Sequence, residues 1–278
     1  MLRERVSSDI YVFTSDLYVQ ATAGVVMTSR GAIVIDTLPF PEEARLMARF
    51  VSQRAPQGAR YLVLTHYHAD HTYGAYLFPS AQVIGYGRCR ELLATRGEEG
   101  LAAARAEAAE LDDVVLRLPT ITLDAGEMAL RLGGKTLRLL WTPGHSDDML
   151  SVFVEEDRVL FAGDTVMPVP TIIDGDLEVL KQSLEQIARL EPETIVQGHG
   201  EVILRGEVQE TIRANIDYLD TIHNLVAKAV AKGRRRETLL TIDIERCGLS
   251  RVALNGQAPN LHVANLLTLY DRMVQHAG

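Results

Sequence analysis

Four apolar segments of the 278-residue chain each end in a short turn that carries histidine or aspartate. They read YLVLTHYHADH (61–71), TLRLLWTPGH (136–145), RVLFAGD (158–164) and ETIVQGH (193–199). Short apolar runs of this kind predict buried strands, and sheet-based folds build their sites on the loops beyond strand ends. The chain is therefore expected to fold so that these four turns meet at one site.

Together the turns carry seven side chains that can bind a metal: His66, His68, Asp70, His71, His145, Asp164 and His199. Five of the eight histidines of the chain belong to this set. Imidazole nitrogen and carboxylate oxygen suit zinc, and also iron or manganese. One catalytic zinc usually takes three protein ligands, whereas two metals sharing one carboxylate would use all seven. The set therefore predicts a two-metal site.

The spacing within the first turn fits this prediction. Side chains two positions apart in an extended segment point the same way, so His66 and His68 can hold one ion. Asp70 and His71 follow at the entry into the next element, where they can reach a second ion.

The pattern His66-x-His68-x-Asp70-His71, with His145, Asp164 and His199 downstream, resembles the metallo-β-lactamase fold superfamily over roughly residues 9 to 203. The resemblance implies an α+β fold, a four-layer αββα sandwich with the metals at one edge between its two sheets. It implies that one metal is held by His66, His68 and His145. A second metal would be held by Asp70, His71 and His199, and Asp164 would bridge the two.

Within this superfamily, true β-lactamases usually carry Cys or Ser where this chain has Asp164. The segment THYHADHTYG (65–74) instead resembles glyoxalase II–related hydrolases. The resemblance implies a hydrolase with two Zn²⁺ per chain, with iron or manganese as alternatives, that uses a metal-bridged hydroxide on a small ester, thioester or lactone. Asp70 would be the catalytic residue that orients the nucleophile. Tyr73 either contacts the substrate or packs beneath the loop, and the apolar segment 166–174 is a candidate wall of the pocket.

Two other functions remain open. Persulfide dioxygenases, which hold a single iron, resemble the same scaffold and keep the same motif. A metal-keeping binding or sensor module without turnover is the third hypothesis.

The remaining sequence predicts a mixed body followed by helices. Strands are expected at 9–15, 23–29, 31–37 and 81–86, and a hairpin at Gly133–Gly134. Helices are expected at 40–55, at 88–111 with interruptions at Gly97 and Gly100, at 176–190, and from about 208 to Gly233. Further helices are expected at 237–248 and 260–276. We predict a catalytic domain at 1–203 and a helical C-terminal extension at 204–278, whose helices serve the core or a homodimer contact.

The composition limits the classes of partner that this chain is expected to bind. The net charge of −9 argues against broad binding of nucleic acid or of an anionic membrane. A small-molecule substrate is expected instead, including an anionic one, because bound cations would reverse the local sign. The N-terminus lacks the apolar core of a secretory signal and no stretch predicts a membrane span, so we expect a cytoplasmic protein. Cys89 and Cys247 have no CxxC partners, which favours two thiols over a single disulfide.

Overall fold

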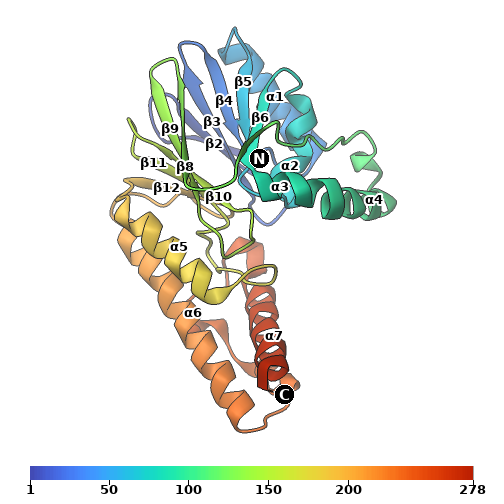
Figure 1. Cartoon of the computed structure of the whole chain (residues 1–278), viewed down its shortest axis with the longest axis vertical. Helices are drawn as coiled ribbons and strands as arrows, with labels where there is room; N and C mark the ends of the chain where they lie inside the picture. The colour runs from blue at the N-terminus through green and yellow to red at the C-terminus, as the bar shows by residue number, and fades with distance from the viewer. Residues whose placement is uncertain (278) are drawn as a thin grey trace.

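The computed structural model describes residues 1–277 and arranges them as two sheets between layers of helices (Figure 1). The first sheet has the strand order β1-β2-β3-β4-β5-β6-β7 and the second has the order β12-β11-β10-β9-β8. The strands of the first sheet are β1 (Leu2–Arg5), β2 (Ile10–Thr14), β3 (Thr22–Thr28), β4 (Gly31–Ile35), β5 (Ala59–Val63), β6 (Gln82–Tyr86) and β7 (Ile121–Leu123). Those of the second are β8 (Glu127–Leu132), β9 (Lys135–Trp141), β10 (Leu150–Val154), β11 (Val159–Gly163) and β12 (Thr194–Gln197).

Alternation along the strands explains why the sheets stack. In β4, Ile33 and Ile35 pack into the core between the two sheets, while Val34 packs into the core on the outer face. In β9, Leu139 faces the inner core and Leu140 the outer core of the second sheet. Successive side chains of a strand point to opposite faces, so a strand that is apolar on both faces needs a layer on each side.

Helices supply the two outer layers. The first sheet is covered by α1 (Pro41–Arg54), α3 (Gly87–Leu92) and α4 (Glu98–Glu107), while α2 (Ala69–Thr72) is the short helix after the first histidine turn. The second sheet is covered by α5 (Leu177–Arg189), α6 (Val208–Ala231) and α7 (Ala258–Ala277). The predicted α+β fold, an αββα sandwich followed by helices, is therefore confirmed.

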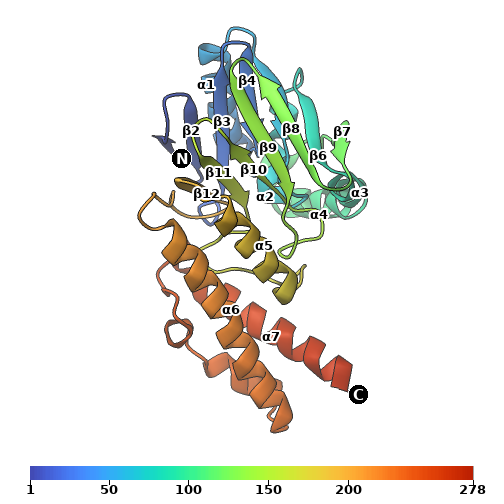
Figure 2. The same ribbon diagram turned by 60° about the vertical axis from the view of Figure 1, so that its left-hand side comes forward.

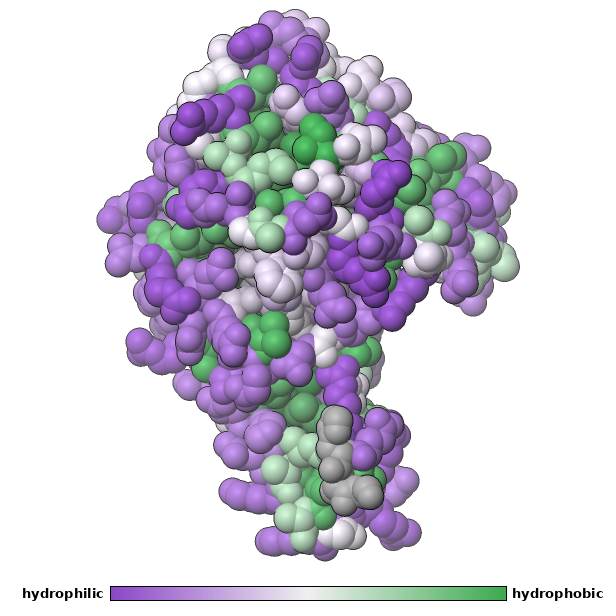
Figure 3. All heavy atoms as spheres, in the orientation of Figure 1, coloured by the Kyte–Doolittle hydropathy of each residue, from purple (hydrophilic) through white to green (hydrophobic). Residues whose placement is uncertain are grey.

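The C-terminal helices α6 and α7 lie side by side and extend away from the sheets (Figures 1 and 2). The apolar core of the second sheet continues into them without a break, from Leu160 of β11 to Leu219 of α6 and Leu266 of α7. Their visible outer surface is mixed, with polar residues around smaller apolar patches (Figure 3). The domain boundary near residue 203 stays a prediction, and the core crosses it.

Two local predictions differ from the structure, and one strand was missed. Gly97 ends a single π-helical turn, η2 (Leu93–Gly97), and Gly100 lies inside α4, so neither glycine interrupts the helical path. A π turn absorbs one extra residue without ending a helix, and a glycine inside a helix costs only about 1 kcal/mol. Segment 237–248 forms two short 3₁₀ turns, η4 (Arg236–Thr241) and η5 (Ile244–Cys247), instead of one helix. Strand β1 was not predicted, because its four residues are mostly polar and lie at the sheet edge.

Two further observations concern the cysteines and the membrane. Cys89 and Cys247 are both buried free thiols, as the sequence favoured. Among the helices of residues 1–277, none combines the length and apolar character that crossing a bilayer requires.

Candidate metal centre

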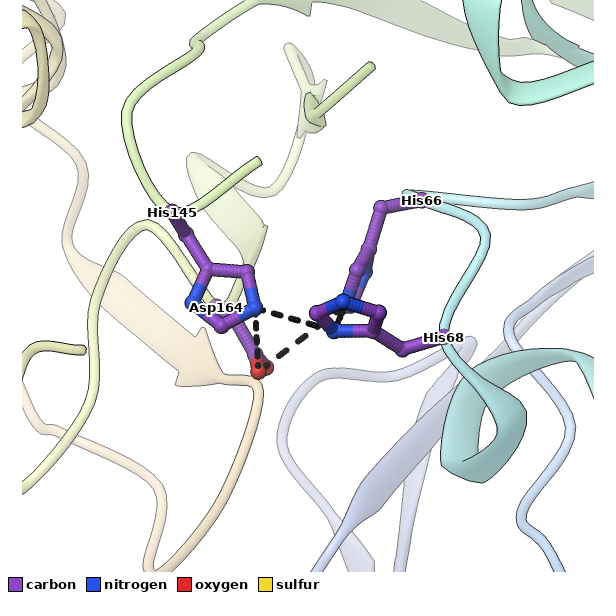
Figure 4. A group of neighbouring side chains, drawn as sticks. All are labelled: His66, His68, His145 and Asp164. Carbon is purple, nitrogen blue, oxygen red and sulfur yellow. Dashed lines mark hydrogen bonds and ion pairs between the residues drawn. The ribbon is translucent and has the colours of Figure 1, made fainter. Parts of the chain in front are cut away.

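The strand directions bring the four histidine and aspartate turns to one edge of the sandwich. β9 and β11 both run antiparallel to β10, and β12 runs parallel to β11, so the carboxyl ends of β9, β11 and β12 lie at the same edge. The first sheet meets them there, because Leu150 N donates to Thr65 O over 2.7 Å. Figure 4 shows the result, with two histidines reaching in from one side and His145 and Asp164 from the other.

The first group of ligand atoms consists of three imidazoles and one carboxylate. His68 Nδ1 lies 2.9 Å from His66 Nε2 and 3.1 Å from His145 Nε2. Asp164 Oδ2 lies 3.3 Å from His145 Nε2. One donor atom from each of the four residues lies within 4.8 Å of the others, which is close enough for all four to surround one ion.

The second group consists of Asp70, His71 and His199. His199 Nε2 lies 3.1 Å from Asp70 Oδ2, and His71 Nε2 lies 3.8 Å from the same oxygen. These three donor atoms also lie within 4.8 Å of one another.

Asp164 joins the two groups. Its Oδ1 lies 3.2 Å from His71 Nε2 of the second group, while its Oδ2 faces His145 of the first. Oδ2 is also 3.6 Å from His199 Nε2. The structure therefore brings together all seven side chains that the sequence singled out, with one carboxylate between the two groups.

The second nitrogen of each imidazole points away from the group and lies near an oxygen atom. His66 Nδ1 lies 3.0 Å from Thr65 Oγ1, and His145 Nδ1 lies 2.7 Å from Thr171 Oγ1. The remaining three contacts are His71 Nδ1 to Asp36 Oδ2 (2.9 Å), His199 Nδ1 to Val19 O (2.9 Å) and His68 Nε2 to Asp174 Oδ2 (3.7 Å). Outer partners of this kind fix the ring orientation and tautomer of metal-binding histidines.

Sequence reasoning missed these outer partners. Asp36 gave a usable signal, because it follows the apolar strand β4 as Asp164 follows β11. It has a φ of 56°, an uncommon conformation outside glycine, and accepts hydrogen bonds from Thr65 N and Oγ1 at 2.8 and 2.7 Å. Thr171 and Asp174 lie in the irregular segment proposed as a pocket wall, where no periodic pattern distinguishes them.

Burial keeps two imidazoles of the first group, those of His66 and His145, neutral. It holds the pKa of His66 well below its usual value, and the neighbouring His71 and His68 add to this effect. Burial also lowers the pKa of His145 to about 4, although the charge of Asp164 opposes it. Neutral imidazole is the form that binds a metal, so these rings present free lone pairs at neutral pH.

Carboxylates raise the pKa values of the two imidazoles of the second group. Burial alone would lower the pKa of His199, but Asp164 and Asp70 raise it to about 10. The pKa of His71 is likewise raised well above its usual value, against burial, by Asp164, Asp70 and Asp36. In the metal-free protein, protons on these two rings balance the carboxylates, a role that a divalent cation would take over.

Two observations test whether a metal fits these residues. Among the described side chains, His71 Nε2 and Asp164 Oδ1 are buried and neither makes a hydrogen bond, although they lie 3.2 Å apart. Buried polar atoms without partners are rare in folded proteins, and a bound ion is one of the explanations. The donor set of imidazole nitrogen and carboxylate oxygen suits zinc, iron or manganese, so the residues fit one or two such ions.

Two glycines allow the backbone to come close to the Asp164 carboxylate. A Cβ at Gly198 would collide with the Asp164 carboxylate. Gly163, directly before Asp164, has a φ of 51°, which side chains rarely adopt.

Two tyrosines lie near the second group. Tyr73 is 5% exposed and packs in the apolar core beneath the loop, which favours packing over substrate contact. Tyr18 is 42% exposed. The charge of Asp70, followed by burial, raises the pKa of Tyr18 to about 12, so its hydroxyl keeps its proton at neutral pH.

Comparison with known proteins agrees with this geometry. The family model described as "Metallo-beta-lactamase superfamily" matches residues 18–199, which contain all seven side chains. The chain belongs to this superfamily. A beta-lactamase-like protein 2 homolog of Caenorhabditis elegans is 31% identical over 143 residues, covering 51% of this chain and 43% of that protein. A thioesterase of Emericella nidulans is 25% identical over 226 residues, covering 80% of this chain and 55% of that protein. The chain thus spans about half the length of these relatives.

Solved structures share the superfamily fold. A metallo-beta-lactamase from Pontibacter korlensis aligns with a TM-score of 0.59 at 20% identity, over 76% of this chain and 97% of that one. A stereoselective inverting sec-alkylsulfatase from Pseudomonas sp. aligns with a TM-score of 0.76 at 17% identity, over 97% of this chain and 50% of that one. The second alignment extends the shared fold over nearly the whole chain, including the C-terminal helices.

Proposed function

We propose that this protein is a two-metal hydrolase of a small ester, thioester or lactone, with thioesters as the first class to test. The observation that carries the proposal is the position of Asp164, whose two carboxylate oxygens face the two ligand groups at 3.3 and 3.2 Å. A carboxylate between two ligand groups can hold two ions at the short separation, about 3.5–4 Å, that two-metal hydrolytic sites use. Thioesters come first because a relative matched over 80% of this chain is named a thioesterase.

Metal ions bound there would polarise a substrate carbonyl and lower the pKa of a water to about 7. Three histidines, His66, His68 and His145, would hold the first ion, and Asp70, His71 and His199 the second. Zinc is the metal proposed, two per chain, with iron or manganese as alternatives. The outer nitrogens of His66, His145, His71 and His199 lie within hydrogen-bond distance of the partners described above, which favours one orientation of each buried ring.

Asp70 is proposed as the catalytic residue. Burial, the largest effect, would raise the pKa of the Asp70 carboxyl. The neighbouring His71 and His199 outweigh it and hold this pKa below the usual range. Asp70 is therefore ionised at neutral pH and can accept a hydrogen bond that orients the attacking water. Tyr18, whose pKa the charge of Asp70 raises, keeps its hydroxyl proton and can donate a hydrogen bond to the substrate. We retain a substrate role for Tyr73 only as a weaker alternative, because that side chain is buried.

The test is hydrolysis of a panel of thioesters, esters and lactones, with a β-lactam included, by metal-free and zinc-reloaded protein. The expected result is zinc-dependent hydrolysis, with two zinc ions per chain, that His68→Ala abolishes. His223→Ala is the matched control, because His223 lies on α6 outside both ligand groups. Unchanged hydrolysis in His68→Ala would contradict the proposal. One iron per chain with thiol-dependent oxygen uptake would instead support the persulfide dioxygenase alternative, and metal binding without any turnover would support the sensor.

A further inference from the structure

The segment between β11 and α5 contacts two ligands of the first group. Thr171 Oγ1 lies 2.7 Å from His145 Nδ1, and Asp174 Oδ2 lies 3.7 Å from His68 Nε2. At its end the same segment packs against the loop before His145, because Asp176 N donates to Gly144 O over 2.9 Å. The position of this segment therefore orients the His145 ring through a hydrogen bond and sets where the Asp174 carboxylate lies relative to His68.

The segment has no regular secondary structure of its own, and α7 holds its backbone. Asn265 of α7 accepts a hydrogen bond from Ile172 N at 3.0 Å and donates one to Pro170 O at 2.7 Å. Arg272 of α7 donates from its two terminal nitrogens to Gly175 O at 2.6 Å and to Ile173 O at 3.1 Å. Asn265 and Arg272 are seven positions apart, about two helical turns, so both project from the same face of α7.

The Asn265 amide is itself fixed. The side chain is fully buried, and its Nδ2 also lies 3.2 Å from the hydroxyl of Tyr218 on α6. That hydroxyl lies 3.0 Å from His262 Nδ1, so two helices hold the amide in one orientation. A buried polar network whose members are all paired is rigid, and losing one member leaves the others unpaired.

From these contacts we infer that α7 is a structural part of the metal centre, with Asn265 and Arg272 as positioning residues for the first ligand group. They act through the segment 170–175, which orients His145 through Thr171. The same segment carries Asp174 near His68, a carboxylate that Tyr67 and Arg96 also hold. The second group does not depend on them, since the outer partners of His71 and His199 are Asp36 and Val19 O. This inference rests on the metal centre of the proposed function, but it does not depend on which substrate is hydrolysed.

The test compares Asn265→Ala and Arg272→Met with two matched controls on the same helix. Asn260→Ala removes an exposed amide that bonds only Gln257 among the side chains described, and Asp271→Asn removes an exposed ion pair with Arg236. Stepwise zinc titration of the full-length protein gives the two affinities, and the step missing in His145→Ala identifies the first group. Hydrogen–deuterium exchange of peptide 166–176 in metal-free protein reports on the segment itself.

We expect Asn265→Ala and Arg272→Met to accelerate exchange in peptide 166–176 and to weaken the first zinc step by about three- to tenfold. This is below the 10–100-fold loss typical of a direct outer partner, because the residues act at one remove. The second step and both controls should stay within twofold of wild type. Arg272→Lys, which keeps one charged donor, should recover part of the affinity.

Three results would overturn the inference. The first is faster exchange with an unchanged first zinc step, and the second is no change in either measurement. The third is an equal loss in the controls or at the second step, because it would indicate general destabilisation. If Asn265→Ala fails to fold, the partly exposed Arg272 still decides the question through its Met and Lys variants.

Discussion

The two ligand groups of the metal centre use the same donor types but differ in charge. In the first, His66 and His145 have hydroxyl groups of Thr65 and Thr171 as outer partners, and burial keeps both rings neutral. In the second, carboxylates surround His71 and His199 and raise the pKa of both rings. The neutral rings of His66 and His145 are therefore ready to accept a cation, whereas His71 and His199 must exchange their protons for one.

Removing the carboxylate that the groups share should have the largest effect. Asp164→Asn is expected to reduce metal content below two ions per chain and to lower hydrolysis by more than the roughly 100-fold upper range for outer partners, since Asp164 faces both groups. Metal analysis and kinetics on zinc-reloaded protein measure both quantities. Asp217→Asn, on the exposed side of α6, is the control. Full metal content and activity in Asp164→Asn would show that the groups act separately.

Removing one histidine from each group should separate the two sites. His145→Ala and His199→Ala are each expected to bind one ion per chain in place of two, because each leaves the other group intact. Elemental analysis after dialysis counts the remaining ions. If either variant lost both ions at once, the groups would be one cooperative site and the comparison would fail.

Changing the outer partners should have a smaller effect that differs between the groups. Thr171→Val and Asp36→Asn are expected to weaken binding at the first and second group, respectively, by about 10- to 100-fold. Asp36→Asn should lie at the upper end, because it removes a charge and replaces one of the two oxygens that accept hydrogen bonds from Thr65. Competition with a chromophoric chelator measures both affinities. The opposite ranking would mean that the outer charge matters less than the outer hydroxyl.

The smallest expected effect is a difference in proton release. At pH 7–8 a metal entering the second group should displace protons from His71 and His199, since the pKa of His199 is about 10. Binding there should strengthen as pH rises towards 10, while His66 and His145 of the first group release no proton until pH falls towards the His145 pKa of about 4. Calorimetry in buffers of different ionisation enthalpy counts these protons. His199→Gln should release about one proton fewer, and equal release by both groups would contradict the assignment.

Much of this protein could be predicted from its sequence, for identifiable reasons. Most strands could be predicted from short apolar runs. The helices α1, α5 and α6 could be predicted from periodic apolar patterns with residues typical of helix ends. The seven side chains could be found because each follows such a strand within a few residues. Strand β1 was missed because an edge strand needs no apolar face, and the π turn at Gly97 because one extra residue leaves no mark on composition.

The outer partners show where sequence reasoning stops. Thr171 and Asp174 lie in an irregular segment, and the contacts that hold it come from Asn265 and Arg272, more than ninety positions away. A hydrogen bond between distant segments leaves no periodicity in either of them. The same holds for Val19, whose contribution to His199 is a backbone carbonyl that any residue would supply.

The order of residues along the chain thus determined most of the elements, because these depend on local alternation of apolar and polar side chains. It also determined the donor types, because these are the side chains themselves, whereas the layers were expected only from the resemblance to the superfamily. Tertiary structure alone decided how deeply each imidazole is buried and how many carboxylates lie close to it, and hence that His66 and His145 are neutral whereas the pKa values of His71 and His199 are raised. That outcome depends on distances of a few ångströms between segments far apart in the chain, and charge interactions in a buried site change steeply over such distances.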